Sequence, residues 1–361
     1  MEIISFDLKD KFLAEMQKFH SEFDELVEDV TNEGSLNKVE METVIRYTVP
    51  RSLNSKGLIV VIAYKYLVPD AGEEDLKIAR VLGWCAEMLQ ASFIVSDDMM
   101  DNSELRDGKM CWYRKNKLGN KALNDCFLIE SYVYKLIRRF TSRKQYYVHL
   151  VELFLEVTEK VVIGQCIDVI TCPKESSLDF TKFNMDRYCE VSKWKCGFSL
   201  PVTIAMRMAG IFETNFYTIA DNIMLEMGLF CQVENDYLDC YDSNVSGKIG
   251  NDIEERKCTW LIVRALEVGT PEQRRRLMEL YEKCNAPDTT AIDEVKRIYQ
   301  DLDLPSLYAQ YETESYRRVL GMIDSLDGIL PKGIFLEFVN FIYRRQKSYA
   351  VQLTCQLPLG E

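Results

Sequence analysis

The chain has 361 residues, 47% of them hydrophobic, so it is long and apolar enough to bury a large core. Its 44 lysines and arginines against 57 aspartates and glutamates give a net charge of −13. This excludes a surface generally suited to nucleic acid or anionic lipid, because phosphate backbones need a basic footprint. The 12 cysteines form no CxxC pair and there are only 2 histidines, which argues against zinc and thiol-redox sites.

Long stretches with apolar residues at three- and four-residue spacing predict an all-α fold. The β-branched run from Leu58 to Ala63 lies inside such a stretch, and we find no hairpin dipeptide joining two alternating runs, so almost no strand is expected. The predicted long helices span residues 73–101, 147–171, 178–209 and 214–241.

The chain contains no repeat, low-complexity tract or Gly/Ser linker, which predicts one helical domain over residues 1–345. Residues 346–361 lose the helical period and are expected to form an irregular C-terminal extension. No apolar run reaches the roughly 18 residues of a transmembrane helix, and the first residues carry no targeting signal. We therefore expect a cytoplasmic protein without a transmembrane segment.

An acidic cluster, Asp97, Asp98 and Asp101, ends the apolar stretch 82–95. On a helix Asp97 and Asp101 are one turn apart and share a face, so their carboxylates project together. Acids at a helix C-terminus face the negative end of the macrodipole, which is unfavourable unless a cation compensates. Such oxygen ligands suit Mg²⁺, which takes its other oxygens from water and substrate phosphates. A solvated acidic helix end is the alternative.

A second acidic cluster closes the predicted helix over 214–241, and a third helix offers two more polar side chains at i and i+3. Arginine and lysine side chains lie near both clusters in the sequence. Together these features predict a cage for a substrate diphosphate bridged by magnesium ions. The polar residues of the second and third helices are Gln232, Asn235, Asp236, Asp239, Gln165 and Asp168, and the cations are Arg106, Lys248 and Lys257.

Four motifs make the chain resemble the trans-isoprenyl diphosphate synthases, in particular the farnesyl diphosphate synthases of eukaryotes, from about Tyr47 to Arg345. They are FIVSDDMMDNSELRDGKMCWY, GQCIDVIT, GLFCQVENDYLDCY and GKIGNDIEERKCTWL. The resemblance implies the all-α isoprenoid synthase fold, a large helical bundle around a central diphosphate and metal cavity, and usually a homodimer. It also implies Mg²⁺ as the cofactor, with three ions expected and Mn²⁺ as a substitute.

By this resemblance, Asp97, Asp101 and Asp236 match magnesium ligands, and Gln165 and Asp168 match residues that line the site. Arg106, Lys248 and Lys257 match groups that hold the allylic diphosphate. The complete set of expected metal ligands is Asp97, Asp101, Asp168, Asn235, Asp236 and Asp239, and the expected catalytic residues are Asp97, Asp98, Asp101, Arg106 and Lys248. The expected substrate-binding residues are Gln90, Ser92, Phe93, Arg106, Gln165, Lys193, Trp194, Gln232, Lys248 and Lys257.

The chain departs from the family where isopentenyl diphosphate, the nucleophilic co-substrate, is held. Leu53 and Lys56 stand at the family's lysine and arginine positions, and Asp107 replaces the second arginine of a tandem pair. Each charge next to a diphosphate is worth on the order of 3 kcal/mol, so Asp107 turns an attraction into a repulsion. The chain then resembles the insect-type terpene synthases derived from farnesyl diphosphate synthases. We therefore predict a sesquiterpene synthase that ionises farnesyl diphosphate, releases diphosphate and forms a volatile pheromone or defensive product.

The predicted pocket wall is the helix face that carries Gln90, Phe93 and Asp97. Ser92 stands where farnesyl synthases usually carry an aromatic side chain, which leaves room for a fifteen-carbon tail. Alternatively, Ser92 faces another helix of the dimer. Phe93 and Trp194 are candidates for cation–π stabilisation of the allylic cation, although Trp194 is equally consistent with a core residue.

Two other functions remain open. A prenyltransferase with an altered isopentenyl diphosphate site would use Arg51, Lys56 or Lys193 for the lost contacts. A non-catalytic partner subunit is favoured by Asn235, which replaces an acidic residue of the family, and is opposed by the intact Asp97 and Asp101 pair.

Overall fold

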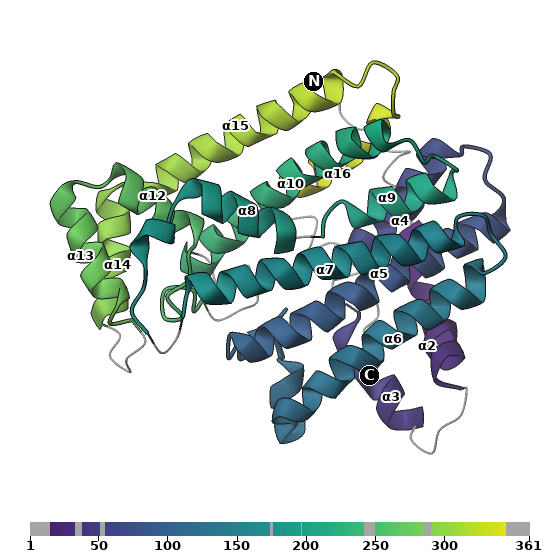
Figure 1. The fold of residues 1–361 in the computed structure, drawn as a ribbon, viewed down its shortest axis with the longest axis horizontal. Helices are drawn as coiled ribbons and strands as arrows, with labels where there is room; N and C mark the ends of the chain where they lie inside the picture. Colours follow the sequence, from purple (N-terminus) through teal and green to yellow (C-terminus); the bar gives the residue numbers. More distant parts are fainter. Residues whose placement is uncertain are drawn as a thin grey trace. The chain divides into compact units, whose positions relative to one another are not determined.

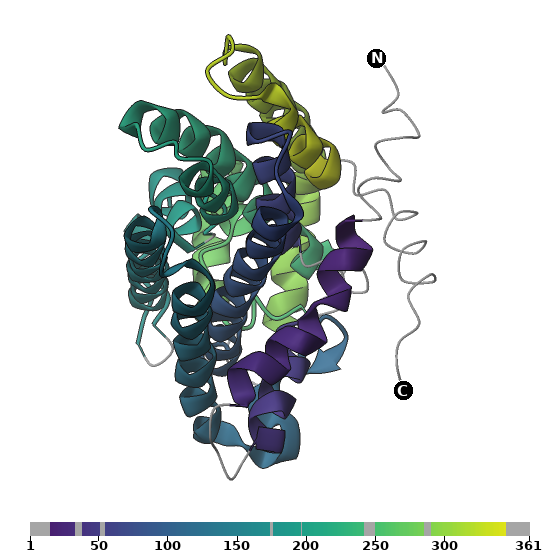
Figure 2. The same cartoon turned by 90° about the vertical axis from the view of Figure 1, so that its right-hand side faces the viewer.

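The computed structural model describes residues 15–32, 38–50, 55–173, 176–195, 197–241, 250–284 and 290–343. Most of the described residues are helical, which confirms the predicted all-α fold (Figures 1 and 2). Two compact units are present. Unit 1 comprises Met1–Asn102, Cys111–Phe154 and Leu200–Tyr217, and unit 2 comprises Ser103–Met110, Leu155–Ser199 and Thr218–Glu361.

Unit 1 is built around one long central helix, α5, which packs against α4, α6 and α9. The shorter helices α2 and α3 pack against each other, and both are drawn in purple in Figure 2. The helices are α2 (Phe23–Thr31), α3 (Lys38–Thr48), α4 (Ser55–Leu67), α5 (Glu73–Met100), α6 (Ala122–Thr141) and α9 (Leu200–Met208), with the 3₁₀ helices η1 (Trp112–Lys117) and η2 (Gly119–Lys121).

Unit 2 packs α12 against α8, α13 and α15, and α13 lies beside α14 (Figure 1). Its helices are η3 (Phe180–Lys182), α8 (Met185–Lys195), α12 (Trp260–Val268), α13 (Pro271–Tyr281), α14 (Thr290–Asp301), α15 (Leu304–Asp324) and α16 (Lys332–Tyr343). Two long helices, α7 (Tyr147–Thr171) and α10 (Thr214–Tyr241), contribute residues to both units. Residues 344–361 lie outside the described residues, so the division at residue 345 stays a prediction.

Helix α5 has so many buried residues because its middle is apolar on every side. Among the described helices it is the one long and apolar enough to cross a membrane, but 83% of that apolar window is buried inside the structure. An apolar helix whose surface is mostly buried in this way is a core helix of the protein. Close packing on α4 is possible because glycines meet at the crossing: a Cβ on Gly83 would lie 2.6 Å from the carbonyl oxygen of Gly57.

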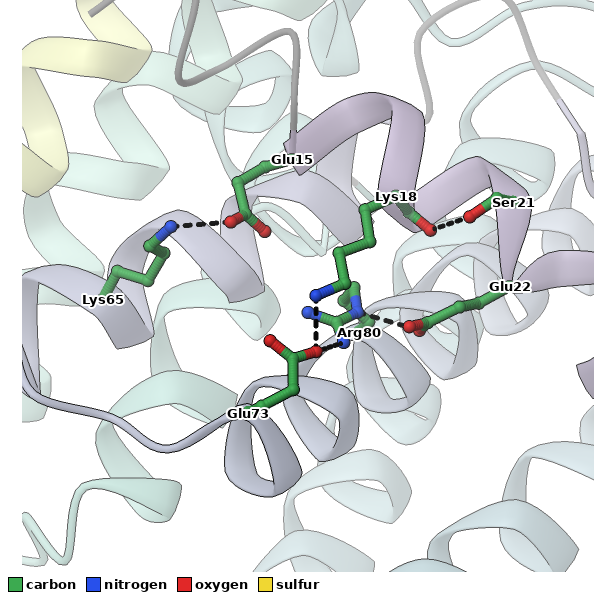
Figure 3. A network of polar contacts seen from close by, with 7 residues as sticks. All are labelled: Glu15, Lys18, Ser21, Glu22, Lys65, Glu73 and Arg80. Carbon is green, nitrogen blue, oxygen red and sulfur yellow. Dashed lines mark hydrogen bonds and ion pairs between the residues drawn. The ribbon is translucent and has the colours of Figure 1, made fainter.

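A buried arginine joins the N-terminal residues to α5 (Figure 3). Arg80 is only 1% exposed, and its guanidinium donates to Glu22 at 2.8 Å and to Glu73 at 2.5 Å. Lys18 also donates to Glu73, and Trp84 donates its indole N–H to the carbonyl oxygen of Phe19 at 3.0 Å. A buried cation is stable only when it is paired in this way, so these contacts fix residues 18–22 on α5.

The predicted helix over residues 178–209 is wrong, because this segment is broken into η3, α8 and α9. Gly197 has a φ of 49°, in the left-handed region that ends a helix, and Leu200–Pro201 begins α9. Glycine is suited to the position where a helix ends, and proline is suited to the first turn of the helix that follows. The other three predicted long helices correspond to α5, α7 and α10.

The structure also contains a short hairpin that the sequence reading missed. Strands β1 (Leu105–Arg106) and β2 (Lys109–Met110) pair antiparallel, with Arg106 opposite Lys109. Asp107 and Gly108 form the turn with φ values of 52° and 75°. Two positive φ values define a type I′ turn, for which Asp-Gly is a favoured dipeptide.

Candidate active site

The first acidic cluster lies in the last turn of α5, as predicted. The backbone N–H of Asp101 donates to the carbonyl oxygen of Asp97 at 2.9 Å, so the two residues are one helical turn apart. Their side chains therefore share a face. Asp97 is half-buried and Asp101 is buried, whereas Asp98 is 3% exposed and lies on the buried side of the helix. Asp97 and Asp101 thus share a face at the end of α5, and Asp98 is buried next to them in the sequence.

The three residues of the predicted pocket wall lie on α5. Gln90, Phe93 and Asp97 are all half-buried and fall within one side of the helix. The amide oxygen of Gln90 accepts a hydrogen bond from the ammonium of Lys56 on α4. This contact brings a cation to the same face that carries Asp97.

Ser92 points away from Gln90 and Asp97 on α5, because the two residues from Gln90 span about 200° and the five residues to Asp97 leave about 140° between them. Its side chain is buried within its own chain, and its hydroxyl donates to the carbonyl oxygen of Leu89 at 2.7 Å. The geometry therefore gives no support to the idea that Ser92 widens the pocket next to Phe93.

Asp107, which we interpreted as a charge change in the site, has a local structural role. It is exposed and occupies the first position of the type I′ turn, where φ is 52°. Aspartate and asparagine tolerate this conformation better than arginine does. Arg106, the residue before it, is half-buried and starts the turn. The hairpin thus explains why an aspartate stands at this position.

The second acidic cluster is organised around Asp236, which is 3% exposed. Oδ2 accepts hydrogen bonds at 2.8 Å from the hydroxyl of Tyr188 and from the backbone N–H of Trp260. Oδ1 accepts one at 2.9 Å from the side-chain amide of Gln232. Burial, followed by the charge of Asp252, raises the pKa of Asp236 to about 7, and these three donors oppose the shift.

The loop that begins at Gly250 packs closely on the end of α10. The backbone N–H of Asp252 donates to Oδ2 of Asp239 at 3.0 Å. A Cβ on Gly250 would lie 2.0 Å from the carbonyl oxygen of Asp239, so only glycine allows this approach. The ammonium nitrogen of Lys257 lies 3.8 Å from Oδ1 of Asp252. Asp239, Asp252 and Lys257 therefore belong to one connected set of charges.

Arg256 fastens this loop to two other segments of unit 2. It is buried, has a φ of 56°, and donates to the carbonyl oxygen of Pro173 at 2.6 Å. It also donates to Glu282 at 3.4 Å, and Glu282 accepts from the backbone N–H of Leu178 at 2.7 Å. These bonds fix the position of the neighbouring Lys257.

The other predicted site residues fall into three groups. Gln165 and Asp168 are half-buried on α7. Asn235 and Lys193 are exposed on α10 and α8. Lys248, Arg51 and Leu53 lie outside the described residues, as does the side chain of Trp194.

Several residues of the second cluster were missed by the sequence reading. Tyr188 and Trp260 contact Asp236 across 48 and 24 residues of sequence. No local pattern marks such partners, because tyrosine and tryptophan in an apolar helix look like core residues. Asp252 and Arg256 lie within one of the quoted motifs. The run of charged residues before Lys257 was the sequence feature that could have identified them.

The donor set of the first cluster fits Mg²⁺. Among the residues that the structure describes, no three His, Cys, Asp or Glu side chains gather closely enough to hold a metal ion alone. Asp97 and Asp101 instead offer two carboxylates on one face. Mg²⁺ is commonly bound by one or two carboxylates that share it with water and phosphate oxygens. The residues thus match an ion that enters together with a diphosphate.

Comparisons with known proteins define the class. The family model described as polyprenyl synthetase matches residues 38–302, and the chain belongs to this family. The chain is 39% identical to farnesyl pyrophosphate synthase of Gallus gallus, over 92% of this chain and 93% of that protein. It is 39% identical to that of Bos taurus, over 94% and 98%, and 37% identical to that of Nezara viridula, over 91% and 82%. The chain is thus a trans-isoprenyl diphosphate synthase of the farnesyl diphosphate synthase type.

These relatives contradict the predicted sesquiterpene synthase. The relatives named above are farnesyl pyrophosphate synthases, and they do not support a lyase, a pheromone product or a likeness to the insect-type terpene synthases. They favour the prenyltransferase alternative. The prediction rested on Leu53, Lys56 and Asp107 as departures from the family, and in the structure Asp107 occupies a hairpin turn.

Proposed function

We propose that the protein is a trans-prenyltransferase that joins an allylic diphosphate to isopentenyl diphosphate, as a farnesyl or geranyl diphosphate synthase does. The observation that carries this proposal is the 39% identity to a farnesyl pyrophosphate synthase over 92% of the chain. The Asp97 and Asp101 pair on one face of α5 is consistent with it, because a departing diphosphate is stabilised by metal ions that such carboxylates can hold.

In this reaction the bond between C1 and oxygen of the allylic diphosphate breaks, and diphosphate leaves. The double bond of isopentenyl diphosphate attacks C1, and the condensed product loses a proton. Magnesium, when bound, neutralises charge on the leaving diphosphate. Asp97 and Asp101 are proposed to hold it, and Arg106 and Lys257 to contact the diphosphate oxygens. Apolar residues of the pocket wall, Phe93 among them, exclude water from the cation.

We propose Lys56 as the cation that anchors isopentenyl diphosphate in place of the family's usual contacts. Its ammonium contacts Gln90, which shares a side of α5 with Phe93 and Asp97. Lys193, the other described candidate, is exposed on α8. Lys56 is therefore the better placed of the two for a substrate that must lie next to the allylic carbon.

The roles proposed for the second cluster differ within it. Asp236 has three hydrogen-bond donors and is buried, so its proposed part is to position the loop that carries Lys257. Asn235, Asp239 and Asp168 remain proposed metal ligands. The number of ions, predicted as three, and substitution by Mn²⁺ also remain proposals.

The proposal includes a homodimer in the cytoplasm. One face of α7 carries apolar side chains that are between 38% and 63% exposed: Leu155, Val162, Ile163, Val169 and Ile170. Three of them recur every seven residues, which is the spacing of a helix that pairs with another helix. The described cysteines are all free, as expected in a reducing compartment.

Release of pyrophosphate tests the proposed function. With Mg²⁺ present, the protein should release pyrophosphate only when both an allylic diphosphate and isopentenyl diphosphate are supplied. Asp97→Ala should abolish release, and Asp301→Ala, which removes an exposed carboxylate, should not. Release from the allylic substrate alone at the same rate would contradict the proposal.

A further inference from the structure

The end of α5 concentrates negative charge that its own last turn does not balance. Asp97, Asp98 and Asp101 lie there, and the last turn contains no basic residue. The carbonyl groups at this end add the negative pole of the helix macrodipole. The chain then turns at Asn102, whose φ is 52°, so that the helix stops. A cation supplied from elsewhere would stabilise this arrangement.

The 3₁₀ helix η1 returns to the end of α5 and is firmly anchored there. Trp112 is buried, and its indole N–H donates to Asp125 of α6 at 2.8 Å. The ring of Tyr47 packs on Trp112 with centroids 5.2 Å apart, and the ammonium of Lys115 lies 3.7 Å from the centroid of Tyr47. Residues 112–115 are thus held in place from two sides.

From this anchor, Arg114 reaches the residue that follows the acidic motif. One guanidinium nitrogen, Nη2, donates to the carbonyl oxygen of Asn102 at 2.9 Å. Nε donates to the hydroxyl of Tyr113 at 2.8 Å. A single planar group therefore connects η1 to the backbone turn that follows the acidic motif.

We propose that Arg114 is a positioning residue for the first acidic cluster, holding the turn at Asn102 so that Asp97 and Asp101 stay directed to one metal site. This inference rests on the proposed function. In this role Arg114 does not contact the substrate. Its hydrogen bond to Asn102 fixes the end of α5, and with it the direction of the two carboxylates.

Arginine is needed here because two bonds in fixed directions are made at once. A lysine ammonium can reach one of the two acceptors but does not present the planar fork that joins them. Arg114→Lys should therefore retain the charge and lose part of the geometry, whereas Arg114→Gln should lose both.

Calorimetric titration of Mg²⁺ into the full-length protein with inorganic pyrophosphate tests this directly, without turnover. Arg114→Gln should weaken Mg²⁺ binding about tenfold, the scale of one hydrogen bond from a charged donor, and Arg114→Lys should lie between it and the wild type. Lys121→Ala, which removes an exposed cation from the neighbouring η2, should change binding less than twofold. The thermal midpoints of all three variants should match that of the wild type.

Equal binding by the wild type and Arg114→Gln, with binding abolished in Asp97→Ala, would overturn this inference and leave the proposed function intact. Equal weakening by Arg114→Gln and Lys121→Ala would also overturn it, since a general charge effect would then suffice. Unaltered binding in Asp97→Ala would overturn both the inference and the proposed metal site.

Discussion

Two opposing effects act on the pKa of Asp236. Its three hydrogen-bond donors favour the ionised form, and its burial and the charge of Asp252 favour the protonated form. The pKa of about 7 means that burial prevails. Asp236, which the sequence predicts to be a metal ligand, also accepts these three hydrogen bonds within the protein.

This shift has a consequence for stability against pH. The folded protein keeps the Asp236 proton up to about pH 7, whereas the unfolded chain loses it near pH 4, so the contribution of Asp236 to stability declines as pH rises between them. In metal-free buffer, the thermal midpoint of the wild type should therefore fall relative to that of Asp236→Asn from pH 5 to pH 7.5. Asp301→Asn is the control. Parallel curves would contradict the shifted pKa.

Lys56 provides a second test with a single residue. Lys56→Met should raise the KM for isopentenyl diphosphate about tenfold, the loss of one charge-assisted hydrogen bond, and leave the KM for the allylic diphosphate within twofold. Lys65→Met, on the same helix, is the matched control because Lys65 pairs with Glu15 at the other end of α4. Equal effects on both KM values would show that Lys56 does not distinguish the two substrates.

The crossing of α4 and α5 depends on two glycines without side chains. Gly83→Ala would place a Cβ against the backbone oxygen of Gly57, which neither helix can avoid without moving. We expect a loss of about 1–3 kcal/mol in the free energy of unfolding, measured by urea denaturation. Gly321→Ala on α15, where a Cβ has open space, should be neutral or stabilising by up to about 1 kcal/mol. Similar effects of both changes would contradict the close crossing.

Structural features that depend only on the spacing of neighbouring residues could be predicted from the sequence. The apolar period gave α5, α7 and α10, and helical spacing alone placed Asp97 and Asp101 on one face. The break at Gly197 was missed because α8 and α9 each continue an apolar period. The Asp107-Gly108 hairpin was missed because its strands have two residues each and show no alternation.

The second cluster could be predicted only in part. Its residues were recognised, but their partners were not, because Tyr188, Trp260 and Asp252 come from three other segments. The burial of Asp236 depends on how these segments pack together. The spacing of apolar residues along a helix does not predict that packing. Ser92 was assigned to the pocket from its position in a motif, and simple helix geometry would have placed it away from the predicted pocket wall on α5.

At the scale of the whole molecule, the exposed apolar face of α7 is expected to be covered by a second copy. Val162→Glu together with Ile170→Glu should convert a dimer into a monomer, as measured by light scattering after gel filtration, because each buried glutamate would be unpaired. Val268→Glu changes an exposed valine on α12 and should leave the dimer intact. A monomeric wild type, or a dimeric double variant, would contradict this assignment.

Mass spectrometry with deuterated isopentenyl diphosphate tests the central claim most directly. The protein, geranyl diphosphate and Mg²⁺ are incubated with the labelled co-substrate, and the prenyl products are weighed after phosphatase treatment. We expect an alcohol one isoprene unit longer than geraniol that carries the deuterium. Unlabelled products formed from the allylic diphosphate alone, with no label incorporated, would contradict the assignment as a prenyltransferase.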